Sequence, residues 1–181
     1  MSRFGDYDGE YQFPNQYEFW QANLERALKG KRGRKVLADL REALMALPQP
    51  RLIERAMCTI GAARRAAGYP EKWLRGGFME DVAAQGEGVC AGGAYLWYQR
   101  VKAGVDPAEA FDSLPTLSDL ENEDTGHATA AALNDAGVVY CLASALAYRN
   151  DETFEGMTPE ERWTAFVAWI DQQLARPVMA R

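Results

Sequence analysis

Histidine and cysteine are scarce in this chain, and closely spaced cysteine pairs are missing. Among 181 residues there is one histidine, His127, and there are three cysteines, Cys58, Cys90 and Cys141. An odd number of widely spaced cysteines is typical of reduced, mostly buried thiols rather than of a disulfide framework. Structural zinc sites usually contain pairs such as Cys-x2-Cys, so this spacing disfavours a zinc site made of these four residues. We expect no cofactor.

Long apolar runs are also missing. No stretch approaches the ~18 consecutive apolar residues that a transmembrane helix needs, so we expect no membrane partner. The first residues, MSRFGDYDGEYQF, lack the apolar stretch of a signal peptide. These features predict a cytoplasmic protein.

Positive charge is rare in the second part of the chain. The formal net charge is -6, but residues 1–105 carry a small positive excess and residues 106–181 are strongly acidic. Such asymmetry is informative about partners rather than about the fold. It predicts one mildly basic face and one acidic face, and the acidic face either maintains solubility or binds a basic partner.

The hydrophobic pattern is helical throughout, and no segment alternates as a strand does. It predicts one all-α domain over 1–181, a bundle of about five to seven helices that starts with a helical hairpin. We expect 1–13 to be an extended arm and 14–48 to be the hairpin, with GKRG as its connection. Residues 106–124 are predicted to form an acidic linker region that includes a short helix, with Asp106 as its cap and Pro107 at its first position.

Three further helices are predicted along the chain. Apolar spacings indicate a helix from about residue 51 to 68, another over 89–102, and a long alanine-rich helix over 125–148. A last helix begins at the capping-box sequence TPEE, in which Thr158 and Glu161 each satisfy a backbone amide of the first turn.

A dense cluster of basic residues lies between the two hairpin helices. Its five cations are Lys29, Lys31, Arg32, Arg34 and Lys35. Near a helix N-terminus such side chains can bind phosphate through their charge and through free backbone amides. Clusters at helix connections are more commonly solvated, so nucleic-acid binding is an alternative and the solvated turn is the favoured interpretation.

Cys90 and His127 are the candidates for enzymatic chemistry. Cys90 precedes a predicted helix, where the helix dipole lowers the pKa of a thiol. A cysteine nucleophile needs a base, and His127, oriented by Asp124, is the available one. Isolated cysteines are usually buried apolar side chains, so an enzyme is the less favoured hypothesis.

Acidic and aromatic side chains form the candidate protein-binding surface. The residues are Asp119, Glu121, Glu123, Asp124, Asp151, Glu152, Glu155 and Trp169. Trp169 lies about 100° around its helix from Ile170 and is expected to be partly exposed. Exposed aromatic residues beside charged ones favour contact with another protein.

Three segments resemble parts of a family of small uncharacterised helical proteins encoded by bacteriophages and prophages. They are NLERALKGKRGRKVLADLREALMALPQPRLI, GEGVCAGGAY and ALAYRNDETFEGMTPEERWTAFVAWIDQQL. The resemblance implies a phage origin and an accessory role in the cytoplasm of the host cell. It carries no activity that transfers residue by residue. It favours a non-enzymatic protein that binds a host or viral protein.

Overall fold

Helices make up most of the described chain. The computed structural model describes residues 16–54, 57–58, 88–114 and 125–178. The helices are α2 (Gln16–Lys29), α3 (Lys31–Ala46), α6 (Ala91–Lys102), α7 (Pro107–Asp112), α8 (Thr125–Asp135), α9 (Tyr140–Tyr148), the π-helical η3 (Arg149–Thr153) and α10 (Pro159–Ala175). Within these ranges the only β pairing is an isolated antiparallel bridge between Cys58 and Val89. The predicted all-α, single-domain bundle is confirmed.

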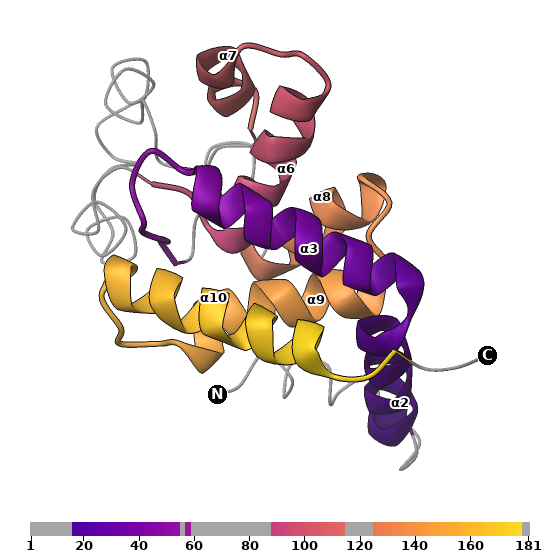
Figure 1. Ribbon diagram of the computed structural model, residues 1–181. Coiled ribbons are helices and arrows are strands. Elements are labelled where there is room, and N and C mark those ends of the chain that lie inside the picture. The colour runs from indigo at the N-terminus through magenta and orange to yellow at the C-terminus, as the bar shows by residue number, and fades with distance from the viewer. Residues whose placement is uncertain (1–15, 55–56, 59–87, 115–124, 179–181) are drawn as a thin grey trace.

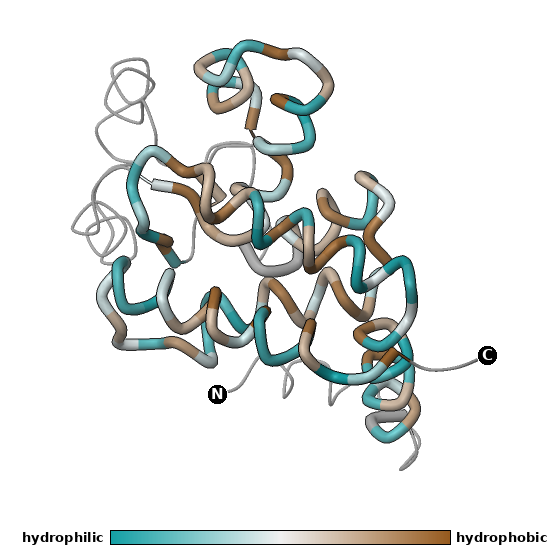
Figure 2. Tube along the Cα trace, viewed as in Figure 1, coloured by the Kyte–Doolittle hydropathy of each residue, from teal (hydrophilic) through white to brown (hydrophobic). Residues whose placement is uncertain are grey.

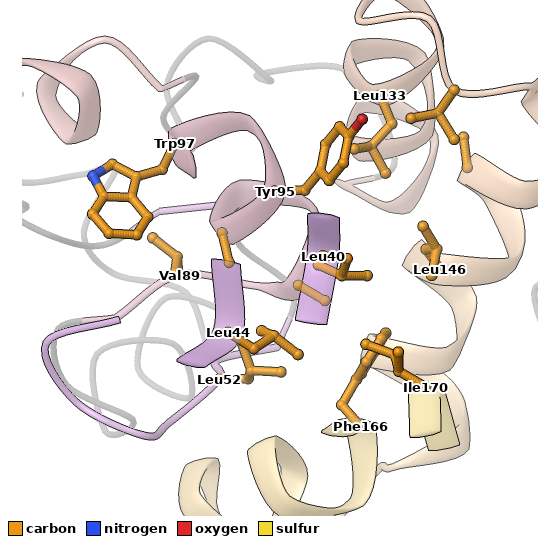
Figure 3. Packing of buried hydrophobic residues seen from close by; sticks show 14 of the residues in the cluster. Leu40, Leu44, Leu52, Val89, Tyr95, Trp97, Leu133, Leu146, Phe166 and Ile170 are labelled. Carbon is orange, nitrogen blue, oxygen red and sulfur yellow. The ribbon is translucent and has the colours of Figure 1, made fainter. Parts of the chain in front are cut away.

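The core is built around α3, which runs between α6 and α10 and packs against both (Figure 1). Leu37, Leu40 and Leu44 are buried along one side of α3, because spacings of three and four place them on a single stripe. Figure 3 shows Phe166 and Ile170 of α10 turned toward this stripe. Each buried leucine or phenylalanine stabilises the fold by about 1.5–3 kcal/mol.

Polar residues alternate with apolar ones around these helices. Figure 2 shows hydrophilic and hydrophobic residues following each other within each turn, as the amphipathic helices of a bundle require. None of the helices in the described ranges is both long and apolar enough to cross a membrane.

Two helices, α2 and α3, occupy the region of the predicted N-terminal hairpin, and their connection differs from the prediction. Gly30 alone separates α2 from α3, and Lys31 to Lys35 lie in the first turns of α3 rather than in a loop. The turn can be this tight because Gly33 has no side chain. A Cβ at this position would lie 1.9 Å from the Ala27 carbonyl oxygen. The glycines of GKRG therefore allow two helix ends to touch.

The predicted long helix over 125–148 is two helices, α8 and α9. Gly137 has a φ of +89°, a left-handed conformation that a glycine adopts without steric cost. The Val138 amide donates to the Leu133 carbonyl and the Gly137 amide donates to the Asn134 carbonyl. This pair of bonds is a Schellman motif, which ends α8 and turns the chain.

The predicted helix from residue 51 is wrong for the part that is described. Residues 51–54 and 57–58 are not helical, and the amides of Leu52 and Ile53 donate to the carbonyls of Pro159 and Val89. Leu52 and Ile53 are fully buried. A short apolar run that is buried on all sides has no helical periodicity to distinguish it from an extended segment. Residues 59–68 lie outside the described ranges.

The predicted N-terminal caps of two further helices, α7 and α10, are confirmed. The Asp106 carboxylate accepts hydrogen bonds from the Ala108 and Glu109 amides, with Pro107 at the first position of α7. Thr158 and Glu161 form both bonds of the capping box of α10. In the region 106–124, α7 occupies the first part and residues 115–124 lie outside the described ranges, as does the arm 1–13.

The close contact at Gly33 makes a prediction with an unusual sign. Replacing glycine by alanine within a helix normally stabilises it by about 1 kcal/mol. At position 33 the new methyl group would strike the α2 backbone, so we expect Gly33→Ala to lower the free energy of unfolding by about 1–3 kcal/mol. Urea unfolding followed by circular dichroism measures the change. Arg32→Ala, an exposed replacement in the same turn, is the control and should be neutral or slightly stabilising.

Candidate functional site

The basic cluster is divided by the structure into engaged and unengaged side chains. Lys29 forms an ion pair with Glu25 at 2.9 Å, and Lys35 forms one with the buried Asp39 at 2.6 Å. Lys31 and Arg32 are exposed, and across the described ranges neither has an ion-pair or hydrogen-bond partner. The predicted five-cation site is therefore reduced to two side chains that are free to meet a ligand.

Arg34, the fifth member of the cluster, stabilises the end of another helix. Its guanidinium donates to the carbonyl oxygens of Gln173, Leu174 and Arg176, at 3.3, 2.5 and 2.8 Å. These carbonyls lie at the C-terminal end of α10, where the last carbonyls of a helix lack intrahelical partners; the Gln173 carbonyl also accepts the Arg176 amide. A cation at a helix C-terminus also interacts favourably with the helix dipole. Arg34 thus joins α3 to α10.

A buried arginine lies at the centre of a polar network that the sequence did not reveal. The Arg162 side chain is 1% exposed, and its Nη1 donates to the Leu52 carbonyl oxygen at 3.0 Å. Its Nη2 donates to Glu54 Oε2 at 2.5 Å and to the Met157 carbonyl oxygen at 3.1 Å. Burial lowers the pKa of Arg162, and the charges of Glu54 and Asp151 oppose that shift.

Asn150 joins three segments of the same network. Its Oδ1 accepts the Ala91 amide at 3.1 Å, at the start of α6. Its Nδ2 donates to the Ile53 carbonyl oxygen and to Asp151 Oδ1, both at 2.8 Å. The π-helical turn η3 directs Asn150 and Asp151 inward together, and such turns are frequent where a helix carries a special role. Here the turn places the Asn150 side chain so that it satisfies the Ile53 carbonyl of the extended segment and the Ala91 amide.

Cys90 is part of this packed region, and its thiol is buried. It is the N-cap of α6, it is 3% exposed, and its Sγ accepts the Gly93 amide at 3.3 Å. Burial, together with the nearby charge of Asp151, raises the pKa of Cys90 to about 12. The dipole effect that would lower the pKa is outweighed by the loss of solvation. The side chain of His127 and residue Asp124 lie outside what is described.

Metal ligands do not gather in the described ranges, where no three His, Cys, Asp or Glu side chains are placed to hold an ion. Cys58 and Cys90 are buried and Cys141 is partly buried, all as free thiols.

The acidic residues of the predicted protein-binding surface differ in how exposed they are. Asp151 is 6% exposed, so the prediction that it belongs to an exposed acidic surface is wrong, because η3 turns it toward the interior. Glu155 is exposed and Glu152 is partly buried. The other four, Asp119, Glu121, Glu123 and Asp124, lie outside the described residues.

Trp169 lies beside an arginine that the sequence gave no reason to select. It is partly buried on α10, and the Arg149 guanidinium is placed over its ring at 4.5 Å from the centroid. The Phe154 ring is 5.8 Å from the same guanidinium. We define the arginine–aromatic surface as Arg149, Phe154 and Trp169 with Glu152 and Glu155. Burial lowers the pKa of Arg149.

Among the residues that the structure describes, Arg149 differs from its basic neighbours in having no ion pair with a carboxylate. Among the described cations of 106–181, Arg162 pairs with Glu54 and Arg176 pairs with Glu25. The Arg149 guanidinium has no carboxylate and no hydrogen-bond acceptor within the part of the chain that is described. This is notable in the most acidic part of the sequence. The sequence contains one signal that could have identified Arg149: only four lysine or arginine residues occur in 106–181.

Comparison with known proteins gives no relative for this chain. No protein-family model, no curated protein and no solved structure matches it.

The buried ion pair predicts a large cost on substitution. Arg162→Met would remove the guanidinium from a buried ion pair with Glu54 and from two carbonyl groups, so we expect a loss of about 3–5 kcal/mol of unfolding free energy. Urea denaturation measures it. Glu160→Gln, on the exposed side of the same helix turn, is the control and should change stability by less than about 1 kcal/mol. An equal effect of both variants would contradict the role of Arg162.

The raised pKa of Cys90 predicts slow alkylation in the native state. At pH 8 a thiol with a pKa of about 12 is almost entirely protonated, and only the thiolate reacts. Timed iodoacetamide labelling with peptide mass spectrometry should show Cys141 modified before Cys58 and Cys90. All three should react together in denaturant. Fast native labelling of Cys90 would restore the nucleophile hypothesis.

Proposed function

We propose that this chain is a non-enzymatic accessory protein of phage or prophage origin, and that it binds a host or viral protein in the cytoplasm of the host cell. The contact is made by the arginine–aromatic surface. This retains Glu152, Glu155 and Trp169 from the predicted acidic and aromatic surface, and it replaces Asp151 with Arg149. The phage origin and the location rest on the family resemblance of the sequence segments.

The observation that carries the proposal is the state of Arg149. A guanidinium that is half removed from water and makes no hydrogen bond loses solvation without compensation. Stacking on Trp169 at 4.5 Å from the ring centroid returns part of that cost. A partner that supplies acceptors would return the rest. Arginine and tryptophan are also the residue types that most commonly dominate the free energy of protein–protein binding.

The surroundings of Arg149 suit a contact surface. Phe154 and Phe166 pack edge to face, as do Phe166 and Trp169, so the aromatic residues beneath the guanidinium are fixed by the core. Glu155 and Met157 are exposed beyond it on the same connection. A rigid apolar base with charged and apolar residues at its edge is the usual organisation of a protein-binding surface.

Affinity capture with matched variants tests the proposal. The tagged full chain, Arg149→Ala and Glu155→Lys are each used to capture proteins from bacterial lysate, and the captured proteins are quantified by mass spectrometry. We expect at least one protein to be depleted about tenfold or more by both variants, as for loss of a dominant contact residue.

The control is the double variant Lys31→Gln/Arg32→Gln, which removes two exposed cations from α3 and leaves the arginine–aromatic surface intact. It should capture the same protein as the unaltered chain. Circular dichroism confirms that each variant is folded. Equal capture by all four chains would reject the arginine–aromatic surface as the binding site.

Nucleic-acid binding is the second candidate function, and one observation favours it. Lys31 and Arg32 are exposed at the start of α3, where the first backbone amides have no acceptor within the helix. The other cations of the cluster, Lys29, Arg34 and Lys35, are bound to groups of the protein itself.

The salt dependence of binding distinguishes contact through Lys31 and Arg32 alone from contact through the whole basic cluster. Each neutralised phosphate contributes about -0.9 to the slope of log K against log salt. Contact through two free cations predicts a slope no steeper than about -2, whereas the whole cluster would give about -4.5. Fluorescence anisotropy with labelled DNA and RNA measures it. Absence of binding at ~50 mM salt would eliminate this candidate.

A further inference from the structure

Helix α2 lies at the edge of the bundle, with one face on the other helices and one face outward. It packs against α3 and α9, and Leu28 is buried on its inner face. Figure 1 shows the N-terminal end of α2 directed away from the other helices. The opposite end is fixed, because Gly33 lets α3 touch the Ala27 carbonyl and Arg176 pairs with Glu25 at 2.7 Å. The outward face is therefore presented on a firmly held helix.

The outward face of α2 carries the most exposed large apolar side chain of the described ranges. Phe19 is 72% exposed, and Ala22, three residues later, is exposed on the same side. Glu18 and Arg26, also exposed, lie on either side of them in the sequence. Within the part of the chain that is described, neither forms an ion pair, and Arg26 donates to Asn23 of its own helix.

The order of these charges is complementary to itself when two copies of α2 lie antiparallel. Glu18 and Arg26 are each four residues from Ala22, in opposite directions. In an antiparallel pair of helices that cross at Ala22, Glu18 of one copy therefore lies at the level of Arg26 of the other. The two-fold axis repeats this contact, so the ion pair forms twice. A parallel pair in register would instead bring like charges together.

The apolar residues occupy the middle of the same arrangement. Ala22 lies at the crossing point, where a small side chain lets two helix axes approach closely. Phe19 of each copy lies within a turn of this point, where it can pack against Ala22 and the aliphatic stem of Arg26 of the other copy. An apolar centre with charged residues at its edge is the usual organisation of a contact between two proteins.

We propose that this chain forms a two-fold symmetric dimer through the outward face of α2, in which Glu18 of each copy pairs with Arg26 of the other and Phe19 is buried between them. The contact uses one helix of 14 residues, which is at the low end of interface sizes, so we expect a Kd of roughly 100 µM. The inference is independent of the proposed function. A dimer carries two copies of the arginine–aromatic surface, so a partner with two matching segments would bind it more tightly.

Sedimentation equilibrium of the full chain tests the dimer and its surface. We expect the average mass to rise toward that of two chains between about 10 µM and about 1 mM protein. Phe19→Ser should weaken association about tenfold, as for loss of a central apolar contact. Glu18→Arg and Arg26→Glu should each weaken it about tenfold or more, because each places like charges at two symmetry-related contacts.

A mixture of the two charge variants tests whether these residues meet. When one Glu18→Arg chain pairs with one Arg26→Glu chain, both contacts again join opposite charges. We expect the equimolar mixture to recover the affinity of the unaltered chain to within about threefold, although each variant alone associates weakly. A general effect of either substitution on the fold or on solubility would not be reversed by mixing.

Arg32→Glu is the matched control, because it changes the net charge as Arg26→Glu does, at an exposed position of α3. It should associate as the unaltered chain does. Circular dichroism confirms that each variant is folded, and the double variant Glu18→Arg/Arg26→Glu, which should also associate, replaces a charge variant that is not. Three outcomes would overturn the inference: a monomer at about 1 mM, association that these variants leave unchanged, or no recovery on mixing.

Discussion

A positive charge buried in the bundle determines how its non-helical segments are placed. Arg162 is buried away from water, and its two terminal nitrogens donate to two backbone carbonyls and to the Glu54 carboxylate. An extended segment can offer such carbonyls, whereas a helix uses them internally. The Leu52 carbonyl and the Glu54 carboxylate therefore join this segment to Arg162 of α10. The Asn150 side chain joins Ile53 to Ala91 in the same way.

Much of the fold could be predicted from the sequence, because local rules and burial agree in most of its helices. The stripes of α3 and α10, the Asp106 cap and the Thr158 capping box all act within a few residues of one another. The errors occurred where the apolar pattern does not decide the conformation. Gly137 ends a helix through a local turn with a positive φ, and the chain at Leu52 is extended because of tertiary contacts with α10 and Val89.

The candidate site was less predictable, since charge in a sequence does not show what each charge contacts. Lys35 and Arg34 belong to one basic cluster, but one meets Asp39 and the other meets the end of α10, some 140 residues later. In the sequence, Arg149 and Trp169 are separated by a turn and part of a helix. Only the packing of η3 against α10 brings them together, so composition could identify Trp169 but not its partner.

The bridge between Cys58 and Val89 has a consequence for the length of the chain. Residues 57–58 and 88–90 are hydrogen-bonded neighbours, so the chain occupies nearly the same place before residue 59 and after residue 87. The entropic cost of bringing two points of a chain together grows only with the logarithm of the number of residues between them. A change in the number of residues between Cys58 and Gly88 would therefore add little to the entropic cost of forming this bridge.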